Sequence, residues 1–284
     1  MTRIKQVIPA IVALAVWLMP AESLARPVNP ATGWLSSVEM GGSTFKMEFA
    51  KDPYFESGSA KSYPYKDTGL EVSDIAQSDG TIFFALGYGW PRFALELLLG
   101  NRSSTIEWKE KLNGTHTKDI RAEGLGGTYW GGRAAGTVWK GDIFSLALGA
   151  FLSVSPNWRV KVWELPEGGD KYEYMSKVPL SSYDAALVMA EGGLDITASW
   201  ELGAWVPWLA LDIRKETSTI GLQINTAGVP IDGKDYLLTP TKGAAIELGV
   251  DWRFTKSLLA RVAVEAGNPT AALFSLNICS GERP

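Results

Sequence analysis

The chain has 284 residues, of which 46% are hydrophobic and 20% charged, with 27 Lys and Arg against 31 Asp and Glu. That length supports a sizeable core, and the aromatic and aliphatic content excludes a disordered chain. Beyond the N-terminal segment no uncharged run approaches the ~20 residues of a spanning helix, which excludes a protein of several membrane helices. The acidic balance argues against a nucleic-acid binder. The single cysteine, Cys279, cannot form an intrachain disulfide, and no residue spacing predicts a metal site or a cofactor.

The first 25 residues are typical of a secretory signal peptide. Arg3 and Lys5 give a positive start, residues 7–19 form a short apolar run, and small residues at 23 and 25 mark a cleavage site. The alternative is a membrane anchor that is retained, for which the apolar run is too short. We therefore expect residues 1–25 to be removed and residues 26–284 to form one exported domain.

From Thr44 onward the apolar residues recur at every second position, which is the period of a β-strand. In the segment 243–254 the alternate positions carry apolar side chains, and the opposite face mixes glycine and alanine with charges of both signs. Similar runs of about ten residues follow along the chain, and this is the length that a tilted strand needs to cross a bilayer.

A soluble sandwich also alternates, but three features favour a transmembrane barrel. The apolar faces are longer than soluble strands usually are. The opposite faces suit a narrow lumen where charges pair. Aromatic residues also gather near the expected strand ends, as in interfacial girdles. The predicted girdle consists of Tyr88, Trp90, Trp108, Trp130, Trp139, Trp200, Trp205, Trp252 and Phe254.

Short and long connections alternate along the chain, as they do in barrels with tight turns at one end and extended loops at the other. The four tight turns are predicted at 87–91, 140–142, 201–203 and 255–256, and the longer polar stretches at 51–79, 109–118, 155–181, 226–242 and 267–269. These predict an antiparallel barrel of ten strands: 42–50, 80–87, 91–108, 119–139, 143–154, 182–200, 204–225, 243–254, 257–266 and 270–278. Turns at 130–132 and 191–193 would give twelve strands, and merging weak edges would give eight.

With its export signal, alternation and turn-flanking aromatics, the chain resembles the small outer-membrane β-barrel proteins of Gram-negative bacteria. The segment 242–265, in particular Glu247-Leu248-Gly249-Val250-Asp251-Trp252-Arg253-Phe254-Thr255, is similar to the penultimate hairpins of opacity-type barrels. The resemblance implies an all-β, closed transmembrane barrel in the outer membrane, surrounded by lipid. One departure is that such barrels usually finish on an aromatic residue, whereas this chain runs past Phe274 and Ile278 into six further residues.

Charged residues on the non-lipid face are expected to point into the lumen, because charges facing lipid are costly. The predicted lumen network contains Arg92, Glu96, Asp212, Arg214, Glu247, Asp251, Arg253, Arg261 and Glu265. Either these side chains pair and plug the lumen, or they line a narrow channel for small solutes. The presence of both signs on one hairpin favours the plug.

Catalysis has little support in the sequence. The only histidine, His116, lies in a polar stretch, and no serine or acid can be placed beside it from spacing. The omptin-type outer-membrane proteases are ten-stranded and depend on acids with histidine, but no matching motif surrounds His116. We interpret His116 as a solvated loop residue and keep a rim hydrolase as a third alternative.

The predicted loops are the other candidate site. Residues 51–79 carry Tyr54, Phe55, Tyr63 and Tyr65, and residues 155–181 carry Trp158, Trp163, Tyr172 and Tyr174. Aromatic-rich exposed loops suit contact with a protein or a glycan, although they could instead fold over the barrel mouth as a lid. We therefore predict a monomeric surface protein with a structural or interaction role and no catalytic activity.

Overall fold

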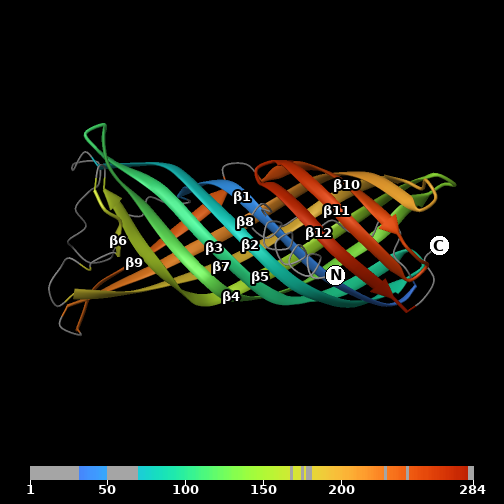
Figure 1. Cartoon of the computed structure of the whole chain (residues 1–284), viewed down its shortest axis with the longest axis horizontal. Coiled ribbons are helices and arrows are strands. Elements are labelled where there is room, and N and C mark those ends of the chain that lie inside the picture. The colour runs from blue at the N-terminus through green and yellow to red at the C-terminus, as the bar shows by residue number, and fades with distance from the viewer. Residues whose placement is uncertain are drawn as a thin grey trace, which may run out of the picture.

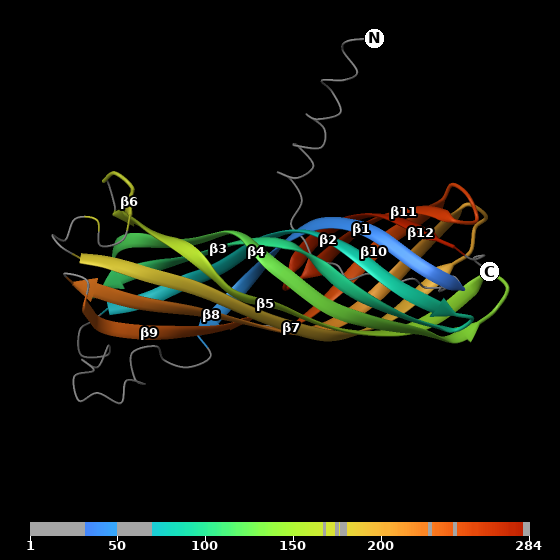
Figure 2. The same ribbon diagram turned by 90° about the horizontal axis from the view of Figure 1, so that it is seen from below.

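The computed structural model describes residues 32–49, 70–166, 169–173, 176, 181–226, 229–240 and 243–280. All regular elements in these ranges are strands: β1 Gly33–Phe49, β2 Leu70–Trp90, β3 Phe93–Leu112, β4 Thr115–Lys140, β5 Phe144–Pro166, β6 Tyr172–Glu173, β7 Ser181–Trp200, β8 Trp205–Thr226, β9 Val229–Pro240, β10 Ala244–Arg253, β11 Leu258–Gly267 and β12 Thr270–Cys279. Figures 1 and 2 show them twisted around one long axis.

Ten of these strands close into a ring. Neighbours along the chain pair antiparallel, β8 pairs with β10, and the ring closes where β1 pairs with β12 from Leu35↔Cys279 to Thr44↔Thr270. Four short turns connect its strands at the end where β1 begins and β12 finishes. We call this the turn end and the opposite one the extended end. Ring closure leaves no unpaired strand edge, which a hydrocarbon environment requires.

At the extended end a ring of eight strands continues the wall. Strands β10, β11 and β12 have ten residues each and stop midway, as Figures 1 and 2 show. Beyond them β9 takes their place, pairing with β8 from Ser218↔Leu238 onward and with β1 at residues 47–49. At the step, the side-chain amide of Asn268 exchanges two hydrogen bonds of 2.8 and 2.9 Å with the backbone of Lys46 and so substitutes for a strand partner.

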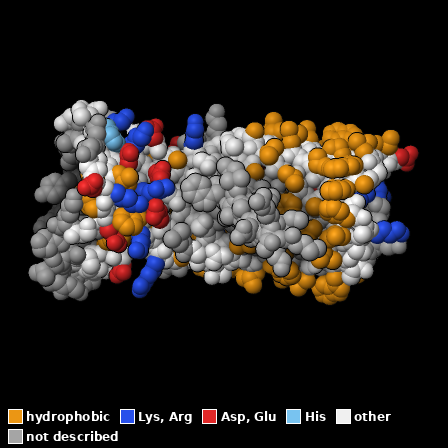
Figure 3. Space-filling model, viewed as in Figure 1, with side chains coloured by type: hydrophobic (Ala, Val, Ile, Leu, Met, Phe, Trp, Pro, Cys, Tyr) orange, Lys and Arg blue, Asp and Glu red, His pale blue; other side chains and the backbone are white. Residues whose placement is uncertain are grey.

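The outer surface divides into an apolar belt at the turn end and a charged part at the extended end (Figure 3). In the belt, outward side chains are exposed although apolar; Leu97, for example, is 73% exposed. The belt crosses all ten strands over about ten residues, the length that tilted strands need to span a bilayer. Aromatic rings border it at the turn end, where Trp205 stacks on Trp252 and Trp252 contacts Phe254.

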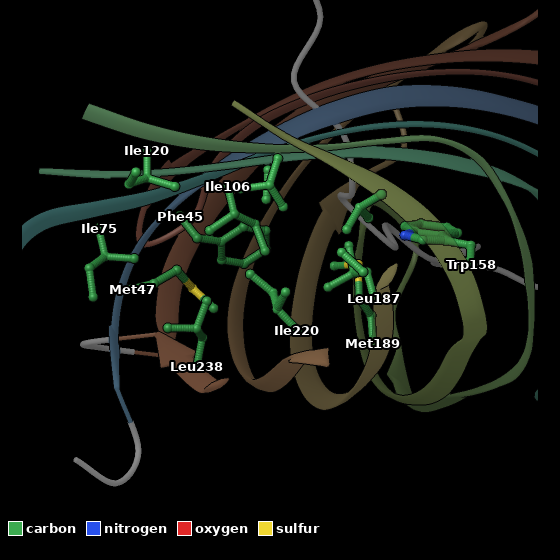
Figure 4. Packing of buried hydrophobic residues seen from close by; sticks show 14 residues of the cluster. Phe45, Met47, Ile75, Ile106, Ile120, Trp158, Leu187, Met189, Ile220 and Leu238 are labelled. Atoms are coloured by element: carbon green, nitrogen blue, oxygen red, sulfur yellow. The ribbon is translucent and has the colours of Figure 1, made fainter. Parts of the chain in front are cut away.

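At the extended end the interior is apolar instead. The buried residues come from β1 to β5 and from β7, β8 and β9. Figure 4 shows their side chains inside the barrel. Each has 9% or less of its surface exposed, so this part of the wall encloses a packed core with a polar exterior, as in a soluble protein. The core consists of Phe45, Met47, Ile75, Ile106, Ile120, Ala122, Trp158, Val160, Val162, Ala185, Leu187, Met189, Ile220 and Leu238.

Strands β4 and β5 each contain one irregularity that exchanges their inward-facing and outward-facing positions. Each strand can therefore point charged side chains inward in the ten-stranded part and apolar side chains inward in the eight-stranded part. On β4 the inward positions change from even to odd numbers around Gly126, whose φ is +83°, and on β5 they change around residues 155–158. The indole of Trp158 lies over Gly127, where an added Cβ would be 0.7 Å from a ring carbon. Glycine at 127 is therefore required by the packing of Trp158.

The ring of ten strands and the four tight turns confirm the sequence prediction. Residues 130–132 and 191–193 lie within β4 and β7, so the turns considered there are wrong. Four predicted loops also need correction, because they contain strand. The stretch 226–242 contains β9, the stretch 109–118 is a continuous hairpin turning at Asn113-Gly114, and β5 continues to Pro166. Of the stretch 51–79, the described part is strand β2.

The predicted signal peptide lies outside the described residues, as do the last four residues of the chain and the aromatic residues predicted at 54, 55, 63, 65 and 174. Among the residues that are described, no helix is long and apolar enough to cross a membrane.

Replacing Gly127 by alanine should destabilise the barrel by about 3 kcal/mol or more, because the new methyl group must displace a buried indole, and overpacking alone costs about 1–3 kcal/mol. Urea unfolding of the detergent-folded protein measures this. Gly132→Ala is the matched control on the same strand, because its Cβ would approach no atom closer than 3.4 Å. Equal stability of the two variants would contradict the packing of Trp158.

Candidate functional site

The lumen of the ten-stranded part holds many buried charged side chains beside small apolar clusters. Among the described residues it contains ten buried carboxylates and four buried arginines, each at most 7% exposed. The carboxylates are Glu39, Asp79, Glu96, Glu191, Asp195, Asp212, Glu216, Glu247, Asp251 and Glu265, and the arginines are Arg102, Arg133, Arg214 and Arg261. We call this set the lumen network.

Arg133 on β4 joins carboxylates from two other strands. Its Nε donates to Glu96 of β3 at 2.6 Å, and its Nη1 donates to Glu39 of β1 at 3.0 Å. Its Nη2 contacts both carboxylates. Because the guanidinium presents a planar fork of donors, one arginine can hydrogen-bond two acids here. This links strands that are not neighbours in the ring.

Arg102 on β3 reaches across the barrel. Its Nη2 donates to Asp79 of the adjacent β2 at 2.6 Å and to Glu216 of β8 at 3.2 Å, and its Nη1 lies 3.4 Å from Glu191 of β7. Glu191 and Glu216 lie directly opposite each other in the β7–β8 register. Two facing carboxylates would repel, and Arg102 offsets that repulsion. The resulting bridge spans the lumen just below the apolar core.

The remaining two arginines pair with three acids of β8, β10 and β11. Arg214 contacts Asp212 on its own strand and donates to both oxygens of Glu265 on β11 at 2.8 and 2.9 Å. Arg261 on β11 makes a two-pronged pair with Asp251 on β10, with both distances 2.6 Å. The indole Nε1 of Trp208 also donates to Asp251 at 3.1 Å.

Of the nine predicted lumen residues, seven have buried side chains inside the barrel: Glu96, Asp212, Arg214, Glu247, Asp251, Arg261 and Glu265. Arg92 needs correction, because it is exposed in the Pro91-Arg92 turn, where strand alternation has ended. Arg253, the last residue of β10, lies at the rim of the lumen. It is partly buried and pairs with Glu201 of the β7–β8 turn at 2.6 and 2.9 Å.

Sequence reasoning missed Glu39, Asp79, Arg102, Arg133, Glu191, Asp195 and Glu216. Glu39 lies at an alternate position between Ser37 and Gly41, and the predicted first strand began after it. Asp79 falls in the predicted loop 51–79. The remaining five fall within predicted strands, but near glycines or beyond the apolar runs that were used to assign the inward face. Continuing the alternation through those glycines would have placed several of them on the inner face.

The predicted aromatic girdle residues lie at three places in the structure: the turn end, the other border of the belt and the interior. Tyr88, Trp90, Trp139, Trp200, Trp205, Trp252 and Phe254 are exposed near the turn end of their strands. Trp130 is 53% exposed and pairs with Leu99 and Val154, so it borders the belt on its other side. Trp108 needs correction: it points inward with Ile106, packs against the apolar core and has its Nε1 3.5 Å from Glu110.

Above the apolar core, polar groups surround the mouth of the extended end. Lys118 Nζ donates to Glu164 at 2.9 Å and lies 3.6 Å from Glu110, and the hydroxyl of Tyr172 donates to Glu164 at 2.6 Å. Burial by itself lowers the pKa of Lys118, but these carboxylates more than offset it, so the pKa is raised. Burial, together with Glu173, raises the pKa of Tyr183 to about 12.

On the outer wall of the extended end, a charged patch surrounds an indole of β5. Trp163 Nε1 donates to Glu123 at 3.0 Å, and the Nζ of Lys171 lies 4.2 Å from the ring centroid of Trp163. Arg121 pairs with Glu107 and Glu123 at 2.8 and 3.2 Å, and Lys161 is exposed beside them. We call residues Glu107, Arg121, Glu123, Lys161, Trp163 and Lys171 the outer patch.

His116 is near the β3–β4 turn, with its Nε2 3.5 Å from Asp119. Both side chains are partly exposed, and a histidine with one acid is shared by many ordinary surfaces. Among the residues that the structure describes, no group of His, Cys, Asp and Glu is arranged to hold a metal ion.

Removing Arg133 should be strongly destabilising, because it leaves Glu39 and Glu96 buried without their cation. We expect Arg133→Met to lower the free energy of unfolding by about 3–5 kcal/mol, measured by urea denaturation in detergent. Arg121→Met removes an exposed pair and should cost at most about 1 kcal/mol. The triple variant R133M/E39Q/E96Q should recover part of the loss. If Arg133→Met lowers the free energy of unfolding no more than Arg121→Met does, Arg133 does not stabilise the buried carboxylates.

Comparison with known proteins gives support at the level of the fold. No family model matches the chain, and no curated protein matches it by sequence. Among solved structures, the outer membrane protease OmpT from Escherichia coli aligns with 91% of this chain and 99% of its own, at a TM-score of 0.52 and 10% identity. OprG from Pseudomonas aeruginosa aligns with 90% of this chain and 100% of its own, at a TM-score of 0.41 and 8% identity. The chain therefore has the fold of an outer-membrane β-barrel.

Proposed function

We propose that this protein is a surface-exposed outer-membrane barrel that makes contacts with a protein or a glycan, without solute passage and without catalytic turnover. In this proposal the turn end faces the periplasm, and the eight-stranded extension projects into the medium. The membrane-spanning ring then anchors the extension, and its outer wall and mouth are the contact surfaces.

The observation that carries the proposal is that the lumen is filled at two heights. The lumen network occupies the ten-stranded part, with Arg102 bridging from β3 to β7 and β8. The apolar core occupies the eight-stranded part above it. A water-filled pore would leave the side chains lining it accessible to water, and these side chains are buried. The filled lumen therefore favours a membrane-anchored contact protein over a channel for solutes.

The outer patch supports the contact role. Its indole and most of its charges lie on the paired long strands β4 and β5, with Glu107 from β3 and Lys171 from the segment before β6. Aromatic side chains and arginine contribute strongly to protein and ligand contacts because they combine contact area with polar groups. The narrow channel is the alternative, favoured by the excess of carboxylates in the lumen, which would attract cations.

Planar-bilayer recording separates the two functions. We expect the purified full chain to give no stepwise conductance at neutral pH, because an ion would have to displace Arg102 and then cross a packed apolar layer. An unrelated open porin reconstituted in the same way is the positive control. Reproducible single-channel steps from the wild-type chain would favour the channel and contradict the anchor.

Binding can be measured with the full chain in lipid nanodiscs over immobilised glycans and purified proteins. Any ligand that the outer patch holds should bind at least tenfold more weakly to the double variant W163A/K171A, because the indole and its cation are both lost. Lys109→Ala, which removes an exposed pair with Asp74 elsewhere on the extended end, is the control. If every ligand binds the double variant and the wild type equally, the outer patch is not the contact site.

A further inference from the structure

Glu247 takes part in none of the ion pairs described above for the lumen network. It lies in the middle of β10 and is 2% exposed, and its Oε1 has no hydrogen-bond partner among the described residues. In the β10–β11 register it lies directly opposite Glu265. Directly opposed residues in an antiparallel pair have their Cβ atoms about 4.5–5.5 Å apart, so two carboxylates face each other inside the lumen.

The cations near Glu247 are already engaged by other acids. Asp212 and Arg214 of β8 and Glu265 and Arg261 of β11 all act on Glu247 electrostatically. Arg214 contacts Asp212 and Glu265, and Arg261 is paired in two-pronged fashion with Asp251 on the same strand as Glu247. Four carboxylates thus share two arginines. Beyond these, Glu191 acts on Arg214, and Glu39 and Arg133 act on Arg261.

We propose that Glu247 is a proton-binding site, and that one proton held between Glu247 and Glu265 is a constituent of the lumen network at neutral pH. An isolated carboxylate taken out of water costs several kcal/mol, and a like charge opposite increases that cost. A protonated carboxyl group carries no charge and can donate its hydrogen to the facing carboxylate. Two carboxylates that share a site and a single proton are a known arrangement in proteins.

The proposal links the stability of the barrel wall to pH. When the proton leaves to water, the β10–β11 hairpin gains one uncompensated negative charge. In the unfolded chain Glu247 is an ordinary solvated carboxylate and has lost its proton by neutral pH. The native state therefore binds one proton more than the unfolded state, and stability falls as pH rises through the titration of the pair. The effect is at most a factor of ten in the unfolding equilibrium constant per pH unit.

The test uses the full chain folded in detergent micelles, with urea unfolding followed from pH 6 to pH 10. As the pH rises, the unfolding equilibrium constant of the wild type should increase by up to tenfold per pH unit. This increase should come on top of any change that Glu247→Gln also shows. Glu247→Gln is isosteric with the protonated acid, so it should fold, match or exceed the wild type at neutral pH and lack that component. Asp251→Asn, on the same strand and facing the same lumen, removes the carboxylate that forms the two-pronged pair with Arg261 and should weaken folding at least tenfold at every pH.

A second measurement does not depend on the stability of a variant. Infrared spectra of the wild type at neutral pH should contain a protonated-carboxyl band that disappears on alkalinisation and is absent from Glu247→Gln. Absence of this band in the wild type would overturn the proposal. So would an equal pH dependence in wild type and Glu247→Gln, or destabilisation by Glu247→Gln as large as that by Asp251→Asn. Stabilisation of the wild type alone by added sodium or calcium ions at fixed pH would assign the site to a metal cation and would also overturn it.

Discussion

Closure of the hydrogen-bond ladder is the constraint on which the rest of this structure depends. Inside a hydrocarbon layer an unpaired strand edge is costly, because no water is present to satisfy its backbone groups. The chain meets this requirement at two circumferences. Strands β1 and β8 are long enough to pair with β12 and β10 in the ten-stranded part and then both with β9 in the eight-stranded part. The three strands that stop midway do so where the apolar belt ends, and Asn268 caps the step with two hydrogen bonds to Lys46.

The same wall encloses two interiors of opposite chemistry. Where the outside is apolar, the inside holds paired charges, and where the outside is charged, the inside holds an apolar core (Figures 3 and 4). Each half places its apolar side chains where water is scarce, whether that is lipid or a packed interior. The change of face on β4 and β5 needs a local irregularity, supplied by Gly126 on one strand and residues 155–158 on the other. Trp158 then covers Gly127 at the junction.

Much of the ten-stranded part could be predicted from the sequence. Its strands place an apolar side chain on the outer surface at every second position, and this two-residue period is visible in the sequence. The hairpin with Glu247, Asp251 and Arg261 is an example. The eight-stranded part could not be predicted in the same way. Strand β9 contains Pro230, Asp232 and Gly233, which read as a loop, and its place depends on the ends of β1 and β8. The partners of Arg102 and Arg133 could not be predicted from the sequence either. Ion pairs across a lumen depend on strand register and ring size rather than on residues that are neighbours in the sequence.

The most direct measurement of this account is a spin-label scan along β8, with Cys279 replaced by serine and single labelled cysteines from residue 205 to residue 219. Collision with oxygen reports contact with lipid, and collision with a water-soluble nickel complex reports contact with water. Labels at the odd positions 207–213 should meet oxygen, labels at 215, 217 and 219 should meet the nickel complex, and labels at the even positions should meet neither. Access of the nickel complex to the odd positions 207–213, or to the even positions along the strand, would contradict a lipid-facing belt around a filled lumen.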